Sequence, residues 1–175
     1  MPDGGLASGG WLVLFVVAQR LAELVLAQAN TARLRAAGAV EFGAAHYPTM
    51  VALHVFWLVA LWIGGQDRSA SLPWLGAFAM LQIARIWVIG SLGRRWTTRV
   101  LVLPGAPAVE AGPYRWLRHP NYAVVTLEIA VVPLALGLPA LALVFSVANA
   151  AMLYHRIRIE NAALEWAAKA AAKSS

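Results

Sequence analysis

The stretch NYAVVTLEIAVVPLALGLPALALVFSVANAAMLY, residues 121–154, is apolar almost throughout and is interrupted near its middle. The interruption runs from Pro133 to Pro139 and includes a glycine. Proline and glycine inside an apolar run end or kink a helix. The stretch is long enough for two short helices, so it predicts a helical hairpin. Its one charged residue, Glu128, lies in the first arm.

Three further apolar segments precede the hairpin, namely Trp11 to Ala29, Tyr47 to Gly64 and Leu72 to Leu92. Each approaches or exceeds the ~20 residues that a helix needs to cross the bilayer core. The chain is 61% hydrophobic and 13% charged, whereas an ordinary soluble domain is roughly 25% charged. The sequence therefore predicts an all-α polytopic membrane helix bundle of about five transmembrane helices, the last two forming a short hairpin.

We expect one integral membrane domain. The domain covers residues 1–175. We expect three N-terminal helices in residues 1–93 and a cytoplasmic connector in residues 94–120. The hairpin and a C-terminal helix follow in residues 121–166, and residues 167–175 form a tail. The first apolar segment contains Arg20 and Glu23, and no Lys or Arg precedes it. We therefore interpret it as part of the mature protein and not as a cleaved leader.

The basic residues predict the orientation in the membrane. They lie in the first and third connections and after the hairpin: Arg33, Arg35, Arg94, Arg95, Arg99, Arg115, Arg118, Arg156, Arg158, Lys169 and Lys173. The second connection holds Asp67 and Arg68 and has no net charge. Because positive loops face the cytoplasm, we expect the N-terminus outside and a cytoplasmic active site in the cell inner membrane. The net charge of +6 then reflects the orientation of the helices in the membrane. We therefore do not expect nucleic acid as a partner.

Four charged residues lie at membrane depth, where each costs at least ~2.5 kcal/mol and needs a partner or a purpose. Arg20 and Glu23 share a helix face, and a structural ion pair and a functional role are equally compatible with that spacing. Arg85 and Glu128 have no opposite charge on their own helices. We expect these two at a functional cavity between the third helix and the hairpin, where Arg85 would stabilise an oxyanion and Glu128 would hold the arginine or accept a proton. A purely structural pair is the alternative.

No metal site is expected. The chain has no cysteine, which excludes disulfides and thiolate metal sites. His46 and His54 are eight residues apart and so lie two helical turns from each other, too far to chelate one metal ion. A buried histidine that hydrogen-bonds is the more ordinary role for His54.

Two polar clusters flank the hairpin, GPYRWLRHPNY at residues 112–122 and RIRIEN at residues 156–161. The hairpin returns the second cluster to the membrane edge where the first one lies. Within the second cluster a helix puts Arg156 and Glu160 on one face and turns Arg158 elsewhere.

The first cluster predicts a shaped loop followed by a helix start. Pro113 and Pro120 push the residues before them, Gly112 and His119, toward extended conformations, and Pro120 suits the first position of the hairpin helix. Free backbone N–H groups there, with the cluster's cations just before them, predict a site for an anionic group such as a carboxylate. Interfacial anchoring explains Arg115, Trp116 and Arg158, but not His119, Asn121 and Glu160 together.

GPYRWLRHPNY, the apolar hairpin and RIRIENAAL together resemble the C-terminal half of the isoprenylcysteine carboxyl methyltransferase superfamily of integral membrane enzymes. Upstream, QRLAELVLAQANTARLRAAGAVEFGAAHYPTMVALH and GRRWTTRVLVLPGAP resemble the bacterial branch associated with type III polyketide synthases. The resemblance covers nearly the whole chain. Two positions depart from the superfamily pattern: Ala123 stands where glycine is frequent, and Asn161 stands where a second acidic residue follows Glu160.

The resemblance implies S-adenosylmethionine as cofactor and S-adenosylhomocysteine as product. It implies that His119 and Tyr122 contact the cofactor, that Arg118 shapes the pocket and that Glu160 holds a polar group. Pro120 and Asn121 are carried over as cofactor-binding members of the same motif. Arg156 would pair with Glu160 or face the acceptor, and we count it with Arg85 and Glu128 as a catalytic residue. Since no G-x-G-x-x-G follows a strand, the soluble dinucleotide-binding fold does not supply this site.

The resemblance also implies the reaction, methylation of the hydroxyl of a long-chain alkylpyrone or alkylresorcinol within membrane lipid, in partnership with a type III polyketide synthase. One alternative is carboxyl methylation of a prenylcysteine or methylation of another lipid. The other is a non-catalytic membrane protein, or a sterol-reductase-like oxidoreductase, on a similar helix scaffold.

Overall fold

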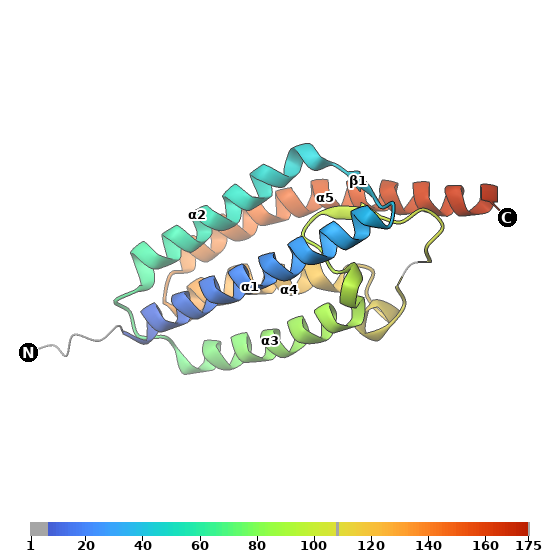
Figure 1. The fold of residues 1–175 in the computed structure, drawn as a ribbon. Helices are drawn as coiled ribbons and strands as arrows, with labels where there is room; N and C mark the ends of the chain where they lie inside the picture. The colour runs from blue at the N-terminus through green and yellow to red at the C-terminus, as the bar shows by residue number, and fades with distance from the viewer. Residues whose placement is uncertain (1–6, 108, 175) are drawn as a thin grey trace, which may run out of the picture.

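The computed structural model describes residues 7–107 and 109–174 (Figure 1). Five α-helices form an elongated bundle: α1 (Ser8–Ala36), α2 (Tyr47–Gly65), α3 (Leu72–Leu92), α4 (Pro120–Ala135) and α5 (Pro139–Ser174). Three short 3-10 helices lie in the connections, η1 (Ala44–His46), η2 (Gly93–Arg95) and η3 (Gly112–Arg115). Four of the described helical spans are long and apolar enough to cross a membrane, and α4 is a shorter apolar helix. The predicted polytopic membrane bundle with a terminal hairpin is confirmed.

The second arm of the hairpin is longer than the sequence led us to expect. α4 ends before Gly137, whose positive φ of 65° turns the chain. α5 then runs unbroken from Pro139 through the RIRIEN cluster and projects beyond the other helices (Figure 1). No glycine or proline follows Pro139, and the last third of α5 is rich in alanine, a strong helix former. The return arm, the second polar cluster and residues 167–174 of the expected tail therefore belong to one helix.

A small antiparallel sheet, which the sequence analysis did not predict, links two connections. β1 (Val40–Phe42) pairs with β2 (Val100–Val102), with Val40 opposite Val102 and Phe42 opposite Val100. Strands of three residues are too short to show an alternating pattern in the sequence. The pairing brings the connection after α1 against the connection after α3.

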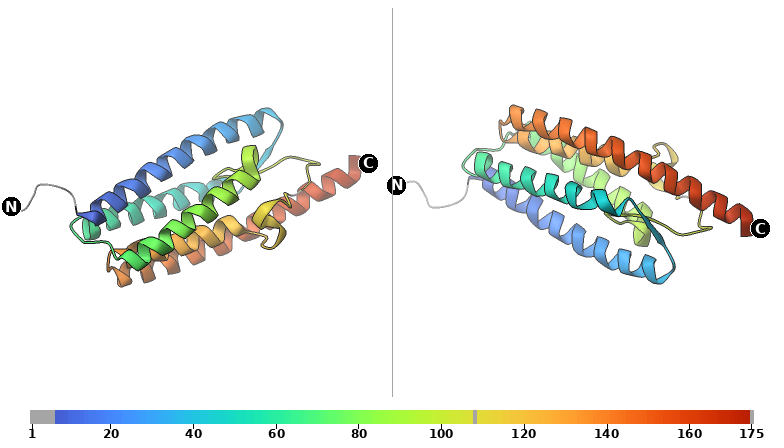
Figure 2. Two further views of the ribbon diagram at one scale, coloured as in Figure 1. Left: turned by 90° about the horizontal axis from the view of Figure 1, so that it is seen from below. Right: turned by 90° about the horizontal axis from the view of Figure 1, so that it is seen from above.

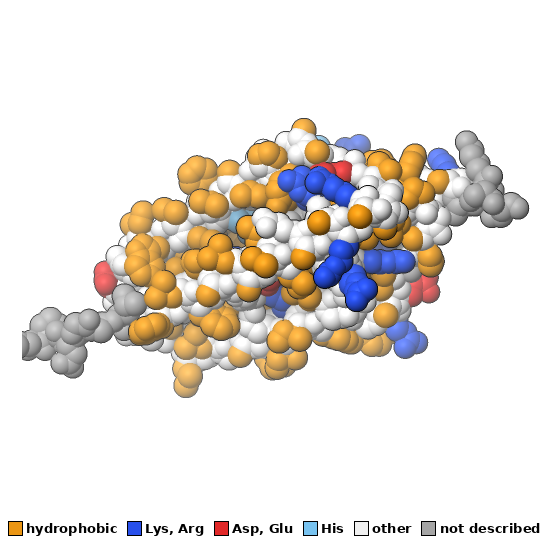
Figure 3. Space-filling view, in the orientation of Figure 1, with side chains coloured by type: hydrophobic (Ala, Val, Ile, Leu, Met, Phe, Trp, Pro, Cys, Tyr) orange, Lys and Arg blue, Asp and Glu red, His pale blue; other side chains and the backbone are white. Residues whose placement is uncertain are grey.

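The connections therefore gather at two opposite ends of the bundle. The basic end carries the sheet, η3 and the second polar cluster, and most of the visible Lys and Arg side chains lie toward it in Figure 3. The turn end carries the α2–α3 and α4–α5 connections, which touch where the Arg68 guanidinium donates to the Gly137 carbonyl at 3.2 Å. All three predicted basic regions thus share one end.

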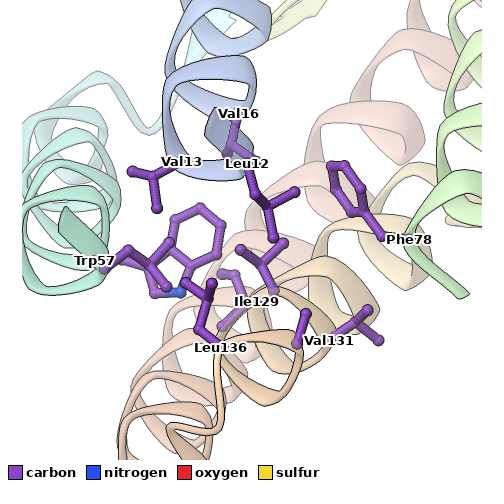
Figure 4. Close-up of a cluster of buried hydrophobic side chains, with 11 residues drawn as sticks. Leu12, Val13, Val16, Trp57, Phe78, Ile129, Val131 and Leu136 are labelled. Atoms are coloured by element: carbon purple, nitrogen blue, oxygen red, sulfur yellow. The ribbon is translucent and has the colours of Figure 1, made fainter. Parts of the chain in front are cut away.

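The apolar core occupies the half of the bundle nearer the turn end. Trp57 is fully buried against residues of α1 and α4, including Val13, Ile129 and Leu136 (Figure 4). Phe78 brings α3 into the same cluster. Burial of these side chains holds four helices together at one end and leaves the other half available for polar groups.

Helices α1 and α2 touch at the turn end and diverge toward the basic end (Figures 1 and 2). A Cβ added to Gly9 would lie only 2.3 Å from the Gly65 carbonyl oxygen, so this contact requires glycine. The Gly9 N–H also donates to the Arg68 carbonyl at 2.9 Å. Contact at one end and divergence at the other leave room for a cavity between the two helices near the basic end.

A charged cluster fastens the small sheet. The Glu41 carboxylate accepts hydrogen bonds from Arg35 and, at 2.6 Å, from Arg99. Burial by itself raises the pKa of Glu41, but the hydrogen bonds and charges of the two arginines outweigh burial and hold that pKa below its ordinary value. A carboxyl group with a lowered pKa stabilises the folded state above its unfolded pKa, and this stabilisation is lost as the pH falls through the folded pKa.

We expect Glu41→Gln to be slightly less stable than the parent protein at neutral pH. The difference should be below about 1 kcal/mol, because water screens the pair; the Arg35 side chain is 53% exposed. The difference in stability between the two proteins should shrink as the pH falls below about 4, where Glu41 of the parent becomes protonated. Thermal unfolding of both proteins in detergent at neutral and acidic pH measures the effect. A difference that grows in acid would contradict this account.

Candidate active site

Four charged side chains from three helices meet in the middle of the bundle. Arg85 on α3 donates from Nε to Glu128 on α4 at 2.7 Å and from a terminal nitrogen to the same carboxylate. Arg20 on α1 donates to Glu128 and, at 2.8 Å, to Glu23. The Glu23 carboxylate lies 3.2 Å from Arg85. Two positive and two negative groups thus form one network. It joins the ion pair of Arg20 and Glu23 to the ion pair of Arg85 and Glu128.

Glu128 is the centre of this network. Its side chain has no exposed surface, and Gln82 adds a third donor at 3.0 Å. Two arginines from different helices depend on this one carboxylate, so it fixes the position of both. Glu128 lines neither of the two cavities described below.

A second polar network lies at the basic end, where α4 begins beside the later turns of α5. The Tyr122 hydroxyl donates to the Glu160 carboxylate and accepts from Arg156 Nε at 2.8 Å. Arg156 also donates to the Thr98 carbonyl at 2.7 Å. The predicted partners Arg156 and Glu160 are therefore brought together through Tyr122, with no direct salt bridge between them.

His119 completes this network. Its ring stacks on the Tyr122 ring, with 5.4 Å between centroids, and its Nδ1 lies 3.7 Å from the Glu160 carboxylate. The side chain of Asn121 accepts from the Trp96 indole at 3.4 Å. The pairing of α4 with α5 thus joins two motifs that are far apart in the sequence.

The start of α4 differs in detail from the sequence prediction. Pro120 is the first helical residue, as expected. The N–H groups of Tyr122 and Ala123, however, donate to the His119 carbonyl at 3.1 and 3.3 Å. Because these donors are already used, the helix start offers an anion fewer N–H groups than we expected.

The backbone before Pro113 also differs. Gly112 adopts a positive φ of 56°, and the prediction of an extended Gly112 was wrong. Glycine has no Cβ, so it reaches this region without the strain that other residues meet there. The turn presses Gly112 against α3: an added Cβ would lie 2.1 Å from the Ser91 Oγ and 3.1 Å from the Trp87 indole nitrogen.

We expect Gly112→Ala to disturb the loop that carries His119 far more than Gly105→Ala does. Both glycines have positive φ, 56° and 74°, but an added Cβ at Gly105 meets nothing within 4 Å. Alanine at either position causes backbone strain on the order of 1 kcal/mol, but only alanine at position 112 also causes a steric clash. Comparing the two variants therefore separates the effect of the clash from that of the strain. Thermal unfolding and proteolysis of the loop compare them. Equal losses in the two variants would show that the clash has no effect.

A cavity of about 210 Å³ opens at the basic end. Five residues predicted to bind cofactor or substrate line it together with Arg156: Arg118, His119, Asn121, Tyr122 and Glu160. Pro120 is buried in the first turn of α4 and is not among the residues that line this cavity. We call this space the polar cavity.

Several residues of the polar cavity were not predicted. They come from the segment around β2: Arg95, Trp96, Thr97, Arg99, Val100, Leu101, Val102 and Leu103. Tyr114 of η3, which belongs to the first polar cluster, also lines the cavity. Burial, and then the Glu160 carboxylate, raise the pKa of the Tyr114 phenol, so its hydroxyl keeps its proton. The β1–β2 pairing and the hydrogen bond from the Trp96 indole to Asn121 hold this segment at the start of α4. The sequence carries no short-range signal for these contacts.

A second cavity of about 250 Å³ lies deeper, between α1, α2, α4 and α5. Its walls are mostly apolar, and Arg20, Glu23, Arg85 and His54 supply its charged or titratable groups on the membrane side. The half-exposed side chains of Leu21, Val51 and Val55 belong to the same wall, so the cavity opens sideways between α1 and α2. We call it the membrane cavity.

The position of the membrane cavity corrects one expectation. We expected an entry between the third helix and the hairpin. Instead α3 packs closely on α4, and Arg85 fills that interface with its hydrogen bonds to Glu128. The Arg85 side chain extends from this interface to the wall of the membrane cavity. The opening of that cavity lies between α1 and α2.

The two cavities share a wall. Five residues line both: Trp96, Thr97, Asn121, Tyr122 and Arg156. One space is rich in charged groups and lies at the end of the bundle, and the other is apolar and open toward lipid. This arrangement would suit a reaction between a polar molecule and a lipophilic one.

Comparison with known proteins agrees with this geometry. Residues 74–166, which include most of α3, both polar clusters, α4 and most of α5, match the model of the isoprenylcysteine carboxyl methyltransferase family. The chain belongs to this family. The match supports a membrane methyltransferase and covers both polar clusters that flank the hairpin.

A bacterial relative extends the similarity beyond the family match. The chain is 40% identical over 161 residues to the uncharacterized protein YpbQ of Bacillus subtilis (strain 168), across 89% of this chain and 96% of the relative. The similarity therefore includes helices α1 and α2, which line the membrane cavity. No solved structure matches the chain.

Proposed function

We propose that the protein is an S-adenosylmethionine-dependent O-methyltransferase that acts on a lipophilic acceptor at the membrane. The observation that carries this proposal is the wall shared by the polar cavity and the membrane cavity, formed in part by Tyr122 and Arg156. A methyl group passes between two molecules only when donor and acceptor are held in line and close together. Two unlike cavities that meet at one wall provide that arrangement.

The residues of the polar cavity fit the groups of the methyl donor. Glu160 offers a carboxylate to ribose hydroxyls or to the ammonium group, and Arg118 offers a cation to the donor's carboxylate. The stacked rings of His119 and Tyr122 offer an aromatic face, and aromatic faces attract cations. When bound, S-adenosylmethionine supplies an electrophilic methyl group on a positively charged sulfur.

The membrane cavity fits an acceptor with a long hydrocarbon chain and a small polar head. Its apolar lining and its opening between α1 and α2 allow the chain to remain in lipid while the head approaches the shared wall. In this proposal Arg85 faces the acceptor oxygen, and Glu128 is a positioning residue that holds Arg85. A long-chain alkylpyrone or alkylresorcinol has the required shape, and a type III polyketide synthase would supply it.

Two measurements test the proposal. Calorimetric titration of the purified protein with S-adenosylhomocysteine is expected to show binding. Labelled S-adenosylmethionine is expected to transfer its methyl group to a long-chain alkylpyrone or alkylresorcinol. Transfer to a prenylcysteine carboxylate instead would keep the methyltransferase and replace the acceptor. A folded protein that does not bind S-adenosylhomocysteine would contradict the whole proposal.

The proposed orientation places the basic end, with the polar cavity, in the cytoplasm. We therefore expect a reporter fused after Glu110, in the connection before η3, to give a cytoplasmic signal. A fusion after Asp67, in the connection at the turn end, is the matched control and is expected to give the opposite signal. Reversed signals from the two fusions would overturn the orientation.

A further inference from the structure

His54 of α2 faces the membrane cavity and has one ring nitrogen already engaged. Nδ1 lies 2.9 Å from the Met50 carbonyl oxygen, one helical turn earlier. A carbonyl oxygen only accepts, so Nδ1 carries the hydrogen in this contact. In the neutral ring Nε2 then holds a lone pair, and no hydrogen bond of Nε2 to another described residue accompanies the one at Nδ1.

His54 shares the membrane cavity with cationic and hydroxyl-bearing side chains. Charged or hydroxyl-bearing side chains line the same cavity from every other helix that borders it: Arg20 and Glu23 of α1, Arg85 of α3, Tyr122 of α4 and Arg156 of α5. Arg20, Arg85 and Arg156 bring three positive charges to the lining of this cavity. Arg20 and Arg85 are held by the carboxylates of the buried network. Arg156 donates to the Tyr122 hydroxyl instead. A proton that moves from an acceptor oxygen to His54 leaves the net charge of the cavity unchanged, while the arginines stabilise the oxygen anion.

A phenolic acceptor needs such a base. A phenol of ordinary acidity has a pKa near 10, so only a small fraction is ionised at neutral pH. An acidic pyrone hydroxyl ionises without help. The two acceptor types therefore differ in what they require from the protein, although both place an oxygen nucleophile in the same cavity.

We propose that His54 is the catalytic base that removes the proton from a phenolic hydroxyl bound in the membrane cavity. This inference rests on the proposed methyltransferase function, narrows its acceptor to a phenol and adds the residue that activates it. The acceptor O–H bond breaks and its proton moves to Nε2. The oxygen electron pair forms the bond to the methyl carbon, while the carbon–sulfur bond breaks and its electrons stay on sulfur as S-adenosylhomocysteine forms. His54 then releases its proton to water.

Two substitutions and one control test the role of His54. His54→Asn keeps an N–H donor for the Met50 carbonyl and removes Nε2, and His54→Gln keeps a polar side chain of similar length without a basic nitrogen. His155→Gln is the matched control, because His155 lies exposed on α5 and lines neither cavity. All three variants should bind S-adenosylhomocysteine with the parent's affinity.

We expect both His54 variants to transfer methyl groups to a long-chain alkylresorcinol about a hundredfold more slowly than the parent at neutral pH. The loss should shrink as the pH rises, since the phenol then ionises unaided. Transfer to a long-chain alkylpyrone should fall less than about tenfold, and His155→Gln should match the parent with both acceptors.

A measurement without transfer checks the same assignment. A long-chain nitrophenol, whose absorbance reports its ionisation, should ionise at lower pH when bound to the parent than in detergent alone. Both His54 variants should reduce that shift, and the part that remains should come from the arginines of the cavity.

If the His54 variants lost the same share of activity with both acceptors at every pH, His54 would not be the catalytic base and would have only a packing role. A parent protein that binds S-adenosylhomocysteine but does not methylate the resorcinol would overturn the phenolic acceptor. Failure of the parent to bind S-adenosylhomocysteine would instead contradict the proposed function, so the two failures are distinguishable.

Discussion

Glu128→Gln is expected to lower the free energy of unfolding by about 3 kcal/mol or more, because it leaves the buried Arg85 and the partly buried Arg20 without their shared carboxylate. The Glu128 side chain is fully buried, and Arg85 is 3% exposed. The loss should appear as a lower thermal midpoint in detergent. Asp67→Asn, at an exposed position of the turn end, removes a carboxylate without breaking this network and should leave the midpoint unchanged.

A double variant separates stability from turnover. Arg85→Met with Glu128→Leu removes one positive and one negative charge and leaves Arg20 paired with Glu23 at 2.8 Å. Replacing a whole buried ion pair with apolar residues is often nearly neutral, so most of the lost stability should return. Turnover should stay low, because Arg85 would no longer face the acceptor. If the double variant were as unstable as Glu128→Gln, the loss in Glu128→Gln would not come from leaving Arg85 without its carboxylate partner.

Glu160→Gln is expected to weaken S-adenosylhomocysteine binding by roughly tenfold to a hundredfold, the loss of a hydrogen bond to a charged group. The structural basis is the network in which Glu160 accepts from Tyr122 and lies 3.7 Å from His119. Calorimetric titration measures the change. Glu165→Gln, one turn later on α5 and exposed, is the matched control and should bind like the parent.

Tyr122→Phe extends this test to the wall between the cavities. It removes the hydroxyl that joins Arg156 to Glu160 but keeps the ring that stacks on His119. We expect weaker binding of S-adenosylhomocysteine and a larger fall in turnover, because Arg156 and the shared wall lose a common anchor. Unchanged binding in both Glu160→Gln and Tyr122→Phe would remove the polar cavity as the donor site.

The sequence by itself determined the membrane class, the hairpin and the motif residues. Apolar segments of spanning length have few other stable arrangements, since each helix satisfies its backbone hydrogen bonds internally. The interruption from Pro133 to Pro139 marks the turn because proline and glycine act locally. His119 and Glu160 stood out because each lies in a short run of polar residues beside an apolar segment, and the family resemblance implied their roles at the cofactor.

Only the tertiary structure decided how these parts meet. The link from Arg156 through Tyr122 to Glu160, the joining of Arg20 with Arg85 on Glu128, and the gap between α1 and α2 all depend on how the helices pack. Helical spacing shows which residues share a face of one helix, but it carries no information on which faces of different helices are neighbours. The β1–β2 pairing, which adds Trp96 and its neighbours to the polar cavity, depends on the same long-range contacts.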